Sequence, residues 1–302
     1  MGPKFKIIIS MAIFGTISIF VKNIPISTGE ISLFRAIIGF LSIAVYQVFS
    51  GNRIKLREIK KDLPILFLSG AAMGFNWILL FQAYRYTTVS LATLSYYFAP
   101  VLLIILSAVF LREKLSTKGI ICFVMASLGL ILIISSGGLE KSTTTTLGIV
   151  YGLGAAGLYA TVIFLNKLIK KVTGIDRTLI QFIGAIIVLT PYVVKTTGIN
   201  IFEISSLGLV NLLVLGVFHT GFTYCIYFSS VKNLKGQEAA ILSYVDPLVS
   251  IIISVAVLGE SISMLQIIGG AMILGFTLLN ELKLDLFRNP RMMIRPNAEN
   301  GD

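Results

Sequence analysis

Ten long apolar segments constrain this chain more than any other feature. About 20 apolar residues in helical conformation cross the bilayer core of about 30 Å. Of the 302 residues, 56% are hydrophobic and 13% are charged, whereas charged residues make up about a quarter of a soluble domain. The sequence therefore predicts an all-α membrane protein with ten transmembrane helices. The expected spans are residues 5–21, 31–49, 63–84, 89–111, 118–134, 147–168, 178–194, 207–229, 237–258 and 265–282.

One motif occurs twice. The first copy begins with Leu94-Ser-Tyr-Tyr-Phe-Ala-Pro100 and ends at Glu113, and the second begins with Ile241-Leu-Ser-Tyr-Val-Asp-Pro247 and ends at Glu260. The separation is the same at both landmarks, because 247 − 100 = 147 and 260 − 113 = 147. This agreement indicates an internal duplication.

The duplication divides the chain into four parts. We expect a first five-helix repeat over residues 1–136 and a polar extracellular linker over 137–146. A second five-helix repeat is expected over 147–282, and a basic, disordered cytoplasmic tail over 283–302.

The positions of the basic residues predict the orientation. If the N-terminus is cytoplasmic, the opposite side keeps little beyond Lys22, Arg85, Lys141 and Lys195. Basic residues in short loops resist translocation across the membrane. We therefore expect a multi-pass protein of the cell (inner) membrane with both termini in the cytoplasm. The net charge of +11 is thus explained by the membrane rather than by nucleic acid. Since five spans is an odd number, the halves form an inverted 5 + 5 repeat, as in secondary transporters.

These features resemble the EamA branch of the drug/metabolite transporter superfamily. The resemblance rests on the paired Pro-to-Glu motifs, the 5 + 5 layout, Arg35 in span two and the helix end Arg85-Tyr-Thr-Thr-Val-Ser-Leu-Ala92. It implies a ten-helix basket in which spans one to four and six to nine surround a central pathway, with spans five and ten outside. It also implies export of amino acids, related metabolites or toxic small molecules. The second half departs from the first, because it has no clear counterpart of Arg35.

Two prolines interrupt spans four and nine. Pro100 and Pro247 each remove a backbone donor and so free the carbonyls of Tyr96 and Ser243. In lipid such carbonyls need protein, water or ligand. We interpret the prolines as a pair of gate hinges, with a static kink as the other interpretation.

Two ionisable residues, Asp246 and His219, are expected nearest the midplane. A charge there costs about 2.5 kcal/mol or more, so each needs a partner or a water-filled cavity. Asp246 is a candidate to bind a substrate amine or a coupling proton, and His219 to share that proton. The alternative is a structural contact between them or with a hydroxyl. In the related family an acidic residue before this proline is common.

Further candidates are polar and aromatic. Arg35 is expected about a turn inside the outer end of span two, where it would either reach the interface or bind a carboxylate. Asn76 and Trp77 fall in mid-span three and suit a zwitterion or a ring. Tyr84 and Tyr86 are assigned to the interfacial belt. The candidate aromatic lining of a cavity comprises Tyr96, Tyr97, Tyr159, Tyr224 and Tyr244.

Other site chemistries find no support in the sequence. Cys122 and Cys225 lack metal-ligand spacing and are expected to be packing residues. Glu113 and Glu260 are expected to be structural. No metal, no cofactor and no enzyme activity are predicted.

The sequence thus predicts a secondary transporter that exports small polar or amphipathic metabolites such as amino acids by alternating access. A multidrug or toxic-compound exporter is the alternative. An intramembrane lipid-modifying enzyme and a non-transporting sensor are less well supported. The expected partners are a small-molecule substrate, the lipid bilayer and, in one version of the mechanism, protons.

Overall fold

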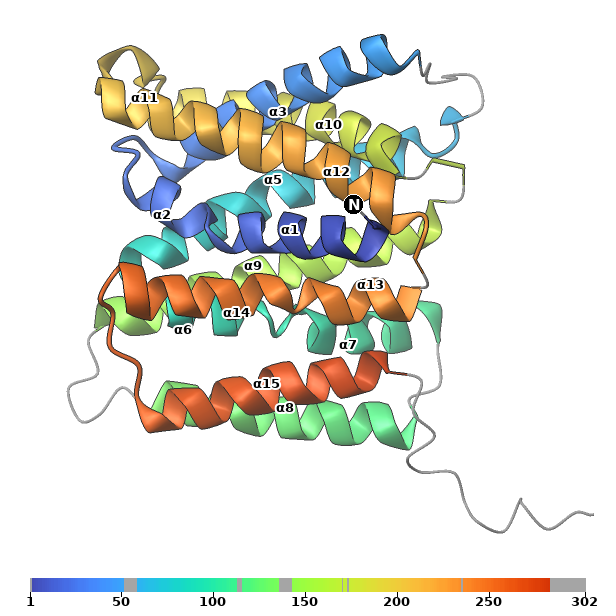
Figure 1. The fold of residues 1–302 in the computed structure, drawn as a ribbon, viewed down its shortest axis with the longest axis vertical. Coiled ribbons are helices and arrows are strands. Elements are labelled where there is room, and N and C mark those ends of the chain that lie inside the picture. Colours follow the sequence, from blue (N-terminus) through green and yellow to red (C-terminus); the bar gives the residue numbers. More distant parts are fainter. Residues whose placement is uncertain are drawn as a thin grey trace, which may run out of the picture.

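The described part of the chain is a stack of helices that run roughly antiparallel (Figure 1). The computed structural model describes residues 2–51, 59–112, 116–135, 143–169, 171–172, 174–234 and 236–282. The first half contains α1 (Pro3–Gly15), α2 (Ile17–Lys22), α3 (Thr28–Ser50), α5 (Leu63–Tyr86), α6 (Val89–Tyr96), α7 (Ala99–Leu111) and α8 (Thr117–Ser135). The second half contains α9 (Thr143–Leu168), α10 (Gly174–Thr196), η1 (Ile201–Glu203), α11 (Ser206–Leu213), η2 (Val214–Phe222), α12 (Thr223–Val231), α13 (Gly236–Ser243), α14 (Val245–Ile252), η3 (Ile253–Val257) and α15 (Met264–Glu281).

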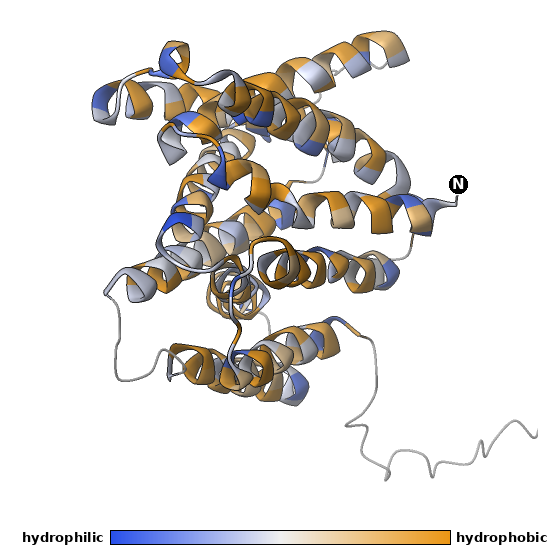
Figure 2. Ribbon diagram, turned by 60° about the vertical axis from the view of Figure 1, so that its left-hand side comes forward, coloured by the Kyte–Doolittle hydropathy of each residue, from blue (hydrophilic) through white to orange (hydrophobic). Residues whose placement is uncertain are grey.

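Within these ranges, nine helical stretches are long and apolar enough to cross a membrane. The expected ninth span is occupied by α13, α14 and η3, which contain the further apolar helical stretch Ile241–Val257. Hydrophobic residues cover most of the length of the helices (Figure 2). The chain is therefore a multi-pass helical membrane protein. Of the expected linker, residues 143–146 begin α9, while 137–142 and the tail from 283 lie outside the described residues.

Polar side chains fix where several helices begin. Ser27 and Glu30 form a capping box at the start of α3, and Ser263 and Gln266 form another at α15. Thr88 accepts a hydrogen bond from the amide of Leu91 at the start of α6. Such caps satisfy amides that have no partner within the helix.

The contacts between the two halves occur in matched pairs. α5 packs on α9, and correspondingly α12 packs on α1. α10 packs on α5 as η2 packs on α3, and α7 packs on α9 as α14 packs on α1. Exchanging the halves thus reproduces the packing. In Figure 1, α6 lies to the left of α7 whereas α13 lies to the right of α14, so these two broken helices run in opposite directions.

α8 and α15 pair with each other at one edge of the stack (Figure 1). A Cβ atom added at Gly129 would lie 2.6 Å from the carbonyl oxygen of Gly269. One added at Gly269 would lie 2.4 Å from that of Gly129. Both positions therefore need glycine, because any side chain would collide with the facing backbone.

Candidate functional site

A cavity of about 530 Å³ lies among the helices. Its lining comes from α1, α2, α3, α5, α6, α7, α9, α10, α12, α13 and α14, and from Glu281 at the end of α15. Among the described residues that line it, none belongs to α8. The position of span five therefore agrees with the expected basket, whereas span ten, expected outside the pathway, contributes Glu281 at its end. The polar lining comprises Arg35, Asn76, Thr93, Asn166, Thr178, Gln181, Ser243, Asp246, Ser250 and Glu281.

Asp246 has one clear partner in this cavity. The hydroxyl of Tyr97 donates to Oδ2 of Asp246 at 2.7 Å. The acid comes from the first turn of α14, and the tyrosine lies between α6 and α7. The two proline-broken spans thus meet through this hydrogen bond, and no described residue donates a hydrogen bond to Oδ1.

Arg35 lies in the cavity wall, with only 3% of its surface exposed. Its Nε donates to Oγ1 of Thr220 at 2.9 Å. Its guanidinium carbon lies 4.4 Å from the ring centre of Trp77 and 5.6 Å from that of Phe81. Arg35 therefore does not reach the interface. Within the described chain, no acceptor occupies its terminal nitrogens, which leaves a planar fork free for a carboxylate or similar anion.

Arg35 and Asp246 share the cavity without neutralising each other. The salt bridges among the described residues are Lys4–Glu238 and Lys22–Glu260, so the guanidinium and the carboxylate lie more than 4 Å apart. Each charge is held by a neutral hydroxyl instead. A cavity with one fixed cation and one fixed anion suits a ligand that carries both charges.

Aromatic rings form most of the remaining wall. Trp77 is 5% exposed and meets Phe182 edge-on at 5.7 Å, while Tyr96 lies 5.3 Å from Tyr159. The seven tyrosines of the lining are Tyr84, Tyr96, Tyr97, Tyr159, Tyr224, Tyr227 and Tyr244. The assignment of Tyr84 to the interfacial belt is wrong. It continues the cavity-facing stripe of α5, which runs through Met73, Trp77 and Leu80.

Two candidates from the sequence are held by the protein itself. Nδ2 of Asn76 donates to the carbonyl of Ala155 at 2.6 Å, which ties α5 to α9 at the cavity wall. Nε2 of His219 lies 2.9 Å from Oγ1 of Thr16, and Nδ1 lies 3.3 Å from the carbonyl of Val214. His219 is absent from the described cavity lining. The structure therefore does not bring His219 and Asp246 together.

The two prolines follow breaks in their spans. α6 ends at Tyr96 and α7 begins at Ala99, one residue before Pro100. α13 ends at Ser243 and α14 begins at Val245, two residues before Pro247. The interruptions fall where the freed carbonyls of Tyr96 and Ser243 were expected.

A buried amide cluster was missed by the sequence reasoning. Nε2 of Gln181 donates to Oγ of Ser69 at 2.6 Å and to Oδ1 of Asn166 at 2.9 Å. Gln181 and Asn166 also line the cavity. The three residues come from α5, α9 and α10, so only the packing of these helices brings them together. Elsewhere in the described ranges, no three His, Cys, Asp or Glu residues gather as a metal site would require.

A charged, aromatic cavity among membrane spans provides the kind of binding site that a transporter of small molecules needs. The chain belongs to the EamA-like transporter family, which it matches over residues 4–135 and again over residues 146–281. The twofold match agrees with the internal duplication.

Relatives from bacteria and archaea are also transporters. The chain is 29% identical to an uncharacterized transporter, YxxF, of Bacillus subtilis over 89% of this chain and 86% of that protein. It is 29% identical to an uncharacterized transporter of Archaeoglobus fulgidus over 90% and 94%. A probable terminal-alkyne amino-acid exporter of Streptantibioticus cattleyicolor is 25% identical over 84% of each chain. A solved crystal structure shares the fold, with a TM-score of 0.59 and 17% identity over 92% of this chain and 94% of that one.

Proposed function

We propose that this chain is a secondary transporter that exports zwitterionic metabolites such as amino acids by alternating access. One observation supports this most strongly: Arg35 and Asp246 face the same aromatic cavity more than 4 Å apart, each with an unoccupied polar group. A substrate carboxylate would bind the guanidinium, and its ammonium group would bind the aspartate. Trp77 and the tyrosines would hold its side chain. The amino-acid exporter among the relatives supports the same substrate class.

The proposed architecture is ten spans in an inverted 5 + 5 arrangement, with the helices around Ile241–Val257 as the ninth span. The basic loops favour an inner-membrane protein with both termini cytoplasmic. The cavity lining includes Glu281, the last residue of α15, and in Figure 1 this end of α15 lies on the same side of the molecule as the N-terminus. Because we place the N-terminus in the cytoplasm, the cavity would open to the cytoplasm. The breaks before Pro100 and Pro247 would act as the hinges.

Intrinsic tryptophan fluorescence can test the proposed substrate. The chain has a single tryptophan, Trp77, and it lies in the cavity wall, so its fluorescence reports occupancy of the site directly. Purified protein is titrated with amino acids of different side chains, and the same ligands are followed into proteoliposomes. Saturable quenching and uptake by zwitterions support the proposal. If N-acetylated or esterified amino acids bind equally well, the two-charge site is refuted.

A multidrug exporter is the second candidate function, because seven tyrosines line the cavity. It predicts that apolar organic cations bind and that Arg35→Gln does not weaken their binding. An amino-acid site predicts instead that zwitterions bind more tightly than organic cations. It also predicts that Arg35→Gln weakens their binding, because the guanidinium then binds the substrate carboxylate.

A further inference from the structure

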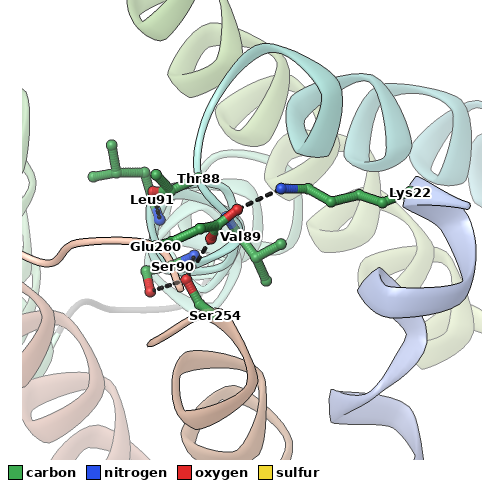
Figure 3. Close-up of polar contacts among 7 residues, drawn as sticks. All are labelled: Lys22, Thr88, Val89, Ser90, Leu91, Ser254 and Glu260. Atoms are coloured by element: carbon green, nitrogen blue, oxygen red, sulfur yellow. Dashed lines mark hydrogen bonds and ion pairs between the residues drawn. The ribbon is translucent and has the colours of Figure 1, made fainter. Parts of the chain in front are cut away.

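The carboxylate of Glu260 joins three separate parts of the structure (Figure 3). It forms an ion pair with Lys22 at the end of α2. It accepts a hydrogen bond from the amide of Val89, the first residue of α6, at 2.7 Å. It also accepts one from Oγ of Ser254 in η3. Spans one, four and nine are therefore fastened together by one side chain.

The local backbone aims Glu260 at this position. Gly259 has φ = +65°, a left-handed conformation that favours glycine. The chain turns back there, and the amide of Glu260 donates to the carbonyl of Ser254 at 2.9 Å. The carboxylate then meets the N-terminus of α6, where backbone amides lack helical partners and a negative charge is favoured.

Serine and threonine pairs extend the same contact inwards. Oγ of Ser90 donates to Oγ of Ser254 at 2.7 Å, and the amide of Ser90 donates to the same oxygen at 3.2 Å. About one turn further along each helix, the hydroxyls of Thr93 and Ser250 lie 3.0 Å apart. Thr93 and Ser250 line the cavity. The contacts between α6 and α14–η3 therefore extend from Glu260 to the lining of the cavity.

These contacts are polar, which distinguishes them from the apolar packing of the core. Carboxylate, hydroxyl and amide groups can exchange a protein partner for water when two helices part, so the free energy of separating them is small compared with that of opening an apolar interface. Both helices also belong to the proline-broken spans. The contact thus lies between the parts of the fold that alternating access would move.

The internal repeat places a related contact at the other end. Lys22 corresponds to Lys167, because 167 − 22 = 145, and Ser254 corresponds to Ser107, because 254 − 107 = 147. Nζ of Lys167 donates to Oγ of Ser107 at 3.0 Å. Corresponding lysines and serines of the two halves thus take part in polar contacts at opposite ends of the molecule.

We propose that Glu260 is the lock of the transport pathway at its own membrane face, holding α6 against α14–η3 until the carrier opens to that side. This inference rests on the proposed alternating-access transport. It assigns a role in gating to a residue that does not line the substrate cavity.

The test measures access to the cavity and needs no substrate. Cys122 and Cys225 are replaced by alanine, and Leu80→Cys is introduced as a reporter in the lining, because Leu80 takes no part in the contact between α6 and α14–η3. Membrane vesicles are treated with a membrane-impermeant maleimide on the Glu260 face. A separate Phe202→Cys variant identifies that face, because Phe202 is 93% exposed in the adjoining loop. We expect Glu260→Gln to raise labelling of the reporter several-fold.

Glu203→Gln is the matched control, since Glu203 lies near the same face and lines a neighbouring pocket with Lys22. It should leave the labelling unchanged. The charge swap Lys22→Glu with Glu260→Lys should also leave the cavity open to the maleimide. A lysine at position 260 cannot accept hydrogen bonds from the Val89 amide or the Ser254 hydroxyl. Unchanged labelling of the reporter in Glu260→Gln overturns the proposal, as does full closure by the charge swap.

Two further measurements keep the outcomes distinct. If Glu260→Gln does not fold, Ser254→Ala serves as the second variant, because it removes a single hydroxyl. It must raise the labelling of the reporter, and unchanged labelling would contradict the proposed role of Glu260. Trp77 fluorescence reports substrate binding separately. If neither the parent nor any variant binds amino acids, the proposed substrate is refuted. The labelling result still shows independently whether Glu260 holds the pathway closed.

Discussion

Tyr97 and Tyr244 occupy the same position in the two repeats, since 244 − 97 = 147, and their ring centres lie 6.4 Å apart in the folded chain. Each stands at the break of its span. The positions are equivalent in sequence but not in chemistry, because only the Tyr97 hydroxyl is bound to Asp246. The two halves therefore meet at the cavity through matched backbones that carry different functional groups.

This difference predicts unequal effects of removing the two hydroxyls. Tyr97→Phe should weaken substrate binding, because a hydrogen bond to a charged group contributes about 1.5 to 3 kcal/mol, or about ten- to a hundredfold in affinity. Tyr244→Phe keeps the ring and leaves Asp246 held, so its effect should be smaller. Titration of Trp77 fluorescence measures both. Equal losses would show that the hydroxyl bond does not position Asp246.

Arg35→Lys should lower affinity by more than tenfold although the charge is retained. Lysine offers a point charge, so it cannot bind a carboxylate with two parallel bonds or stack on Trp77 as the guanidinium does. Arg177→Lys is the control, since Arg177 donates to the carbonyl of Val172 in the protein itself. If Arg35→Lys binds as tightly as the parent, the carboxylate subsite lies elsewhere.

Asp246 and His219 can be separated by transport in proteoliposomes with and without a pH gradient. If transport is coupled to protons, Asp246→Asn should abolish the response to the gradient, because Asp246 faces the cavity. His219→Gln should retain it, since the ring of His219 contacts Thr16 and Val214 instead. A gradient response that survives in Asp246→Asn would remove the coupling role. A parent with no response would be a facilitated carrier.

Gly70→Ala should destabilise the fold. A Cβ atom there would lie 2.1 Å from the carbonyl oxygen of Gln181, so α5 and α10 would have to separate. Overpacking of this kind costs about 1 to 3 kcal/mol. Gly275→Ala in α15 is the matched control, because nothing lies within 4 Å of its added Cβ. Thermal unfolding in detergent should show a lower midpoint for Gly70→Ala alone.

The apolar pattern and the repeat predicted much of the architecture. Helical length and hydropathy located nine spans, and the offset of 147 paired the two broken helices. The proline rule also placed the breaks, because losing a donor and clashing with the carbonyl four residues earlier are local effects. The expected ninth span, residues 237–258, agrees with α13, α14 and η3, which together run from Gly236 to Val257.

The direction of side chains was harder to predict. His219 lies in η2, a π-helical stretch in which its ring contacts the carbonyl of Val214, five residues earlier. A π-helix shifts the residues that share a face, so an α-helical period misplaces a side chain in its middle. Arg35 and Tyr84 show a second limit. Depth along a helix left Arg35 between the interface and a carboxylate site and assigned Tyr84 to the interface, whereas the face of the helix determines that both meet the cavity.

Partners far apart in sequence could not be predicted at all. Gln181 and Ser69 belong to different halves, and no spacing rule connects them. The same holds for Glu260 and Val89, which meet only because α6 and η3 lie side by side.

The glycine contact between α8 and α15 has a consequence for the origin of the chain. Gly129 and Gly269 bring α8 and α15 together, and these are the last helices of the two halves, so each half meets the other through its corresponding helix. Such self-complementary contacts are those of homodimers with twofold symmetry. A half-length ancestor inserted in both orientations would already have had the surface needed to pair with its own copy. Gene fusion would then have preserved an existing dimer within a single polypeptide.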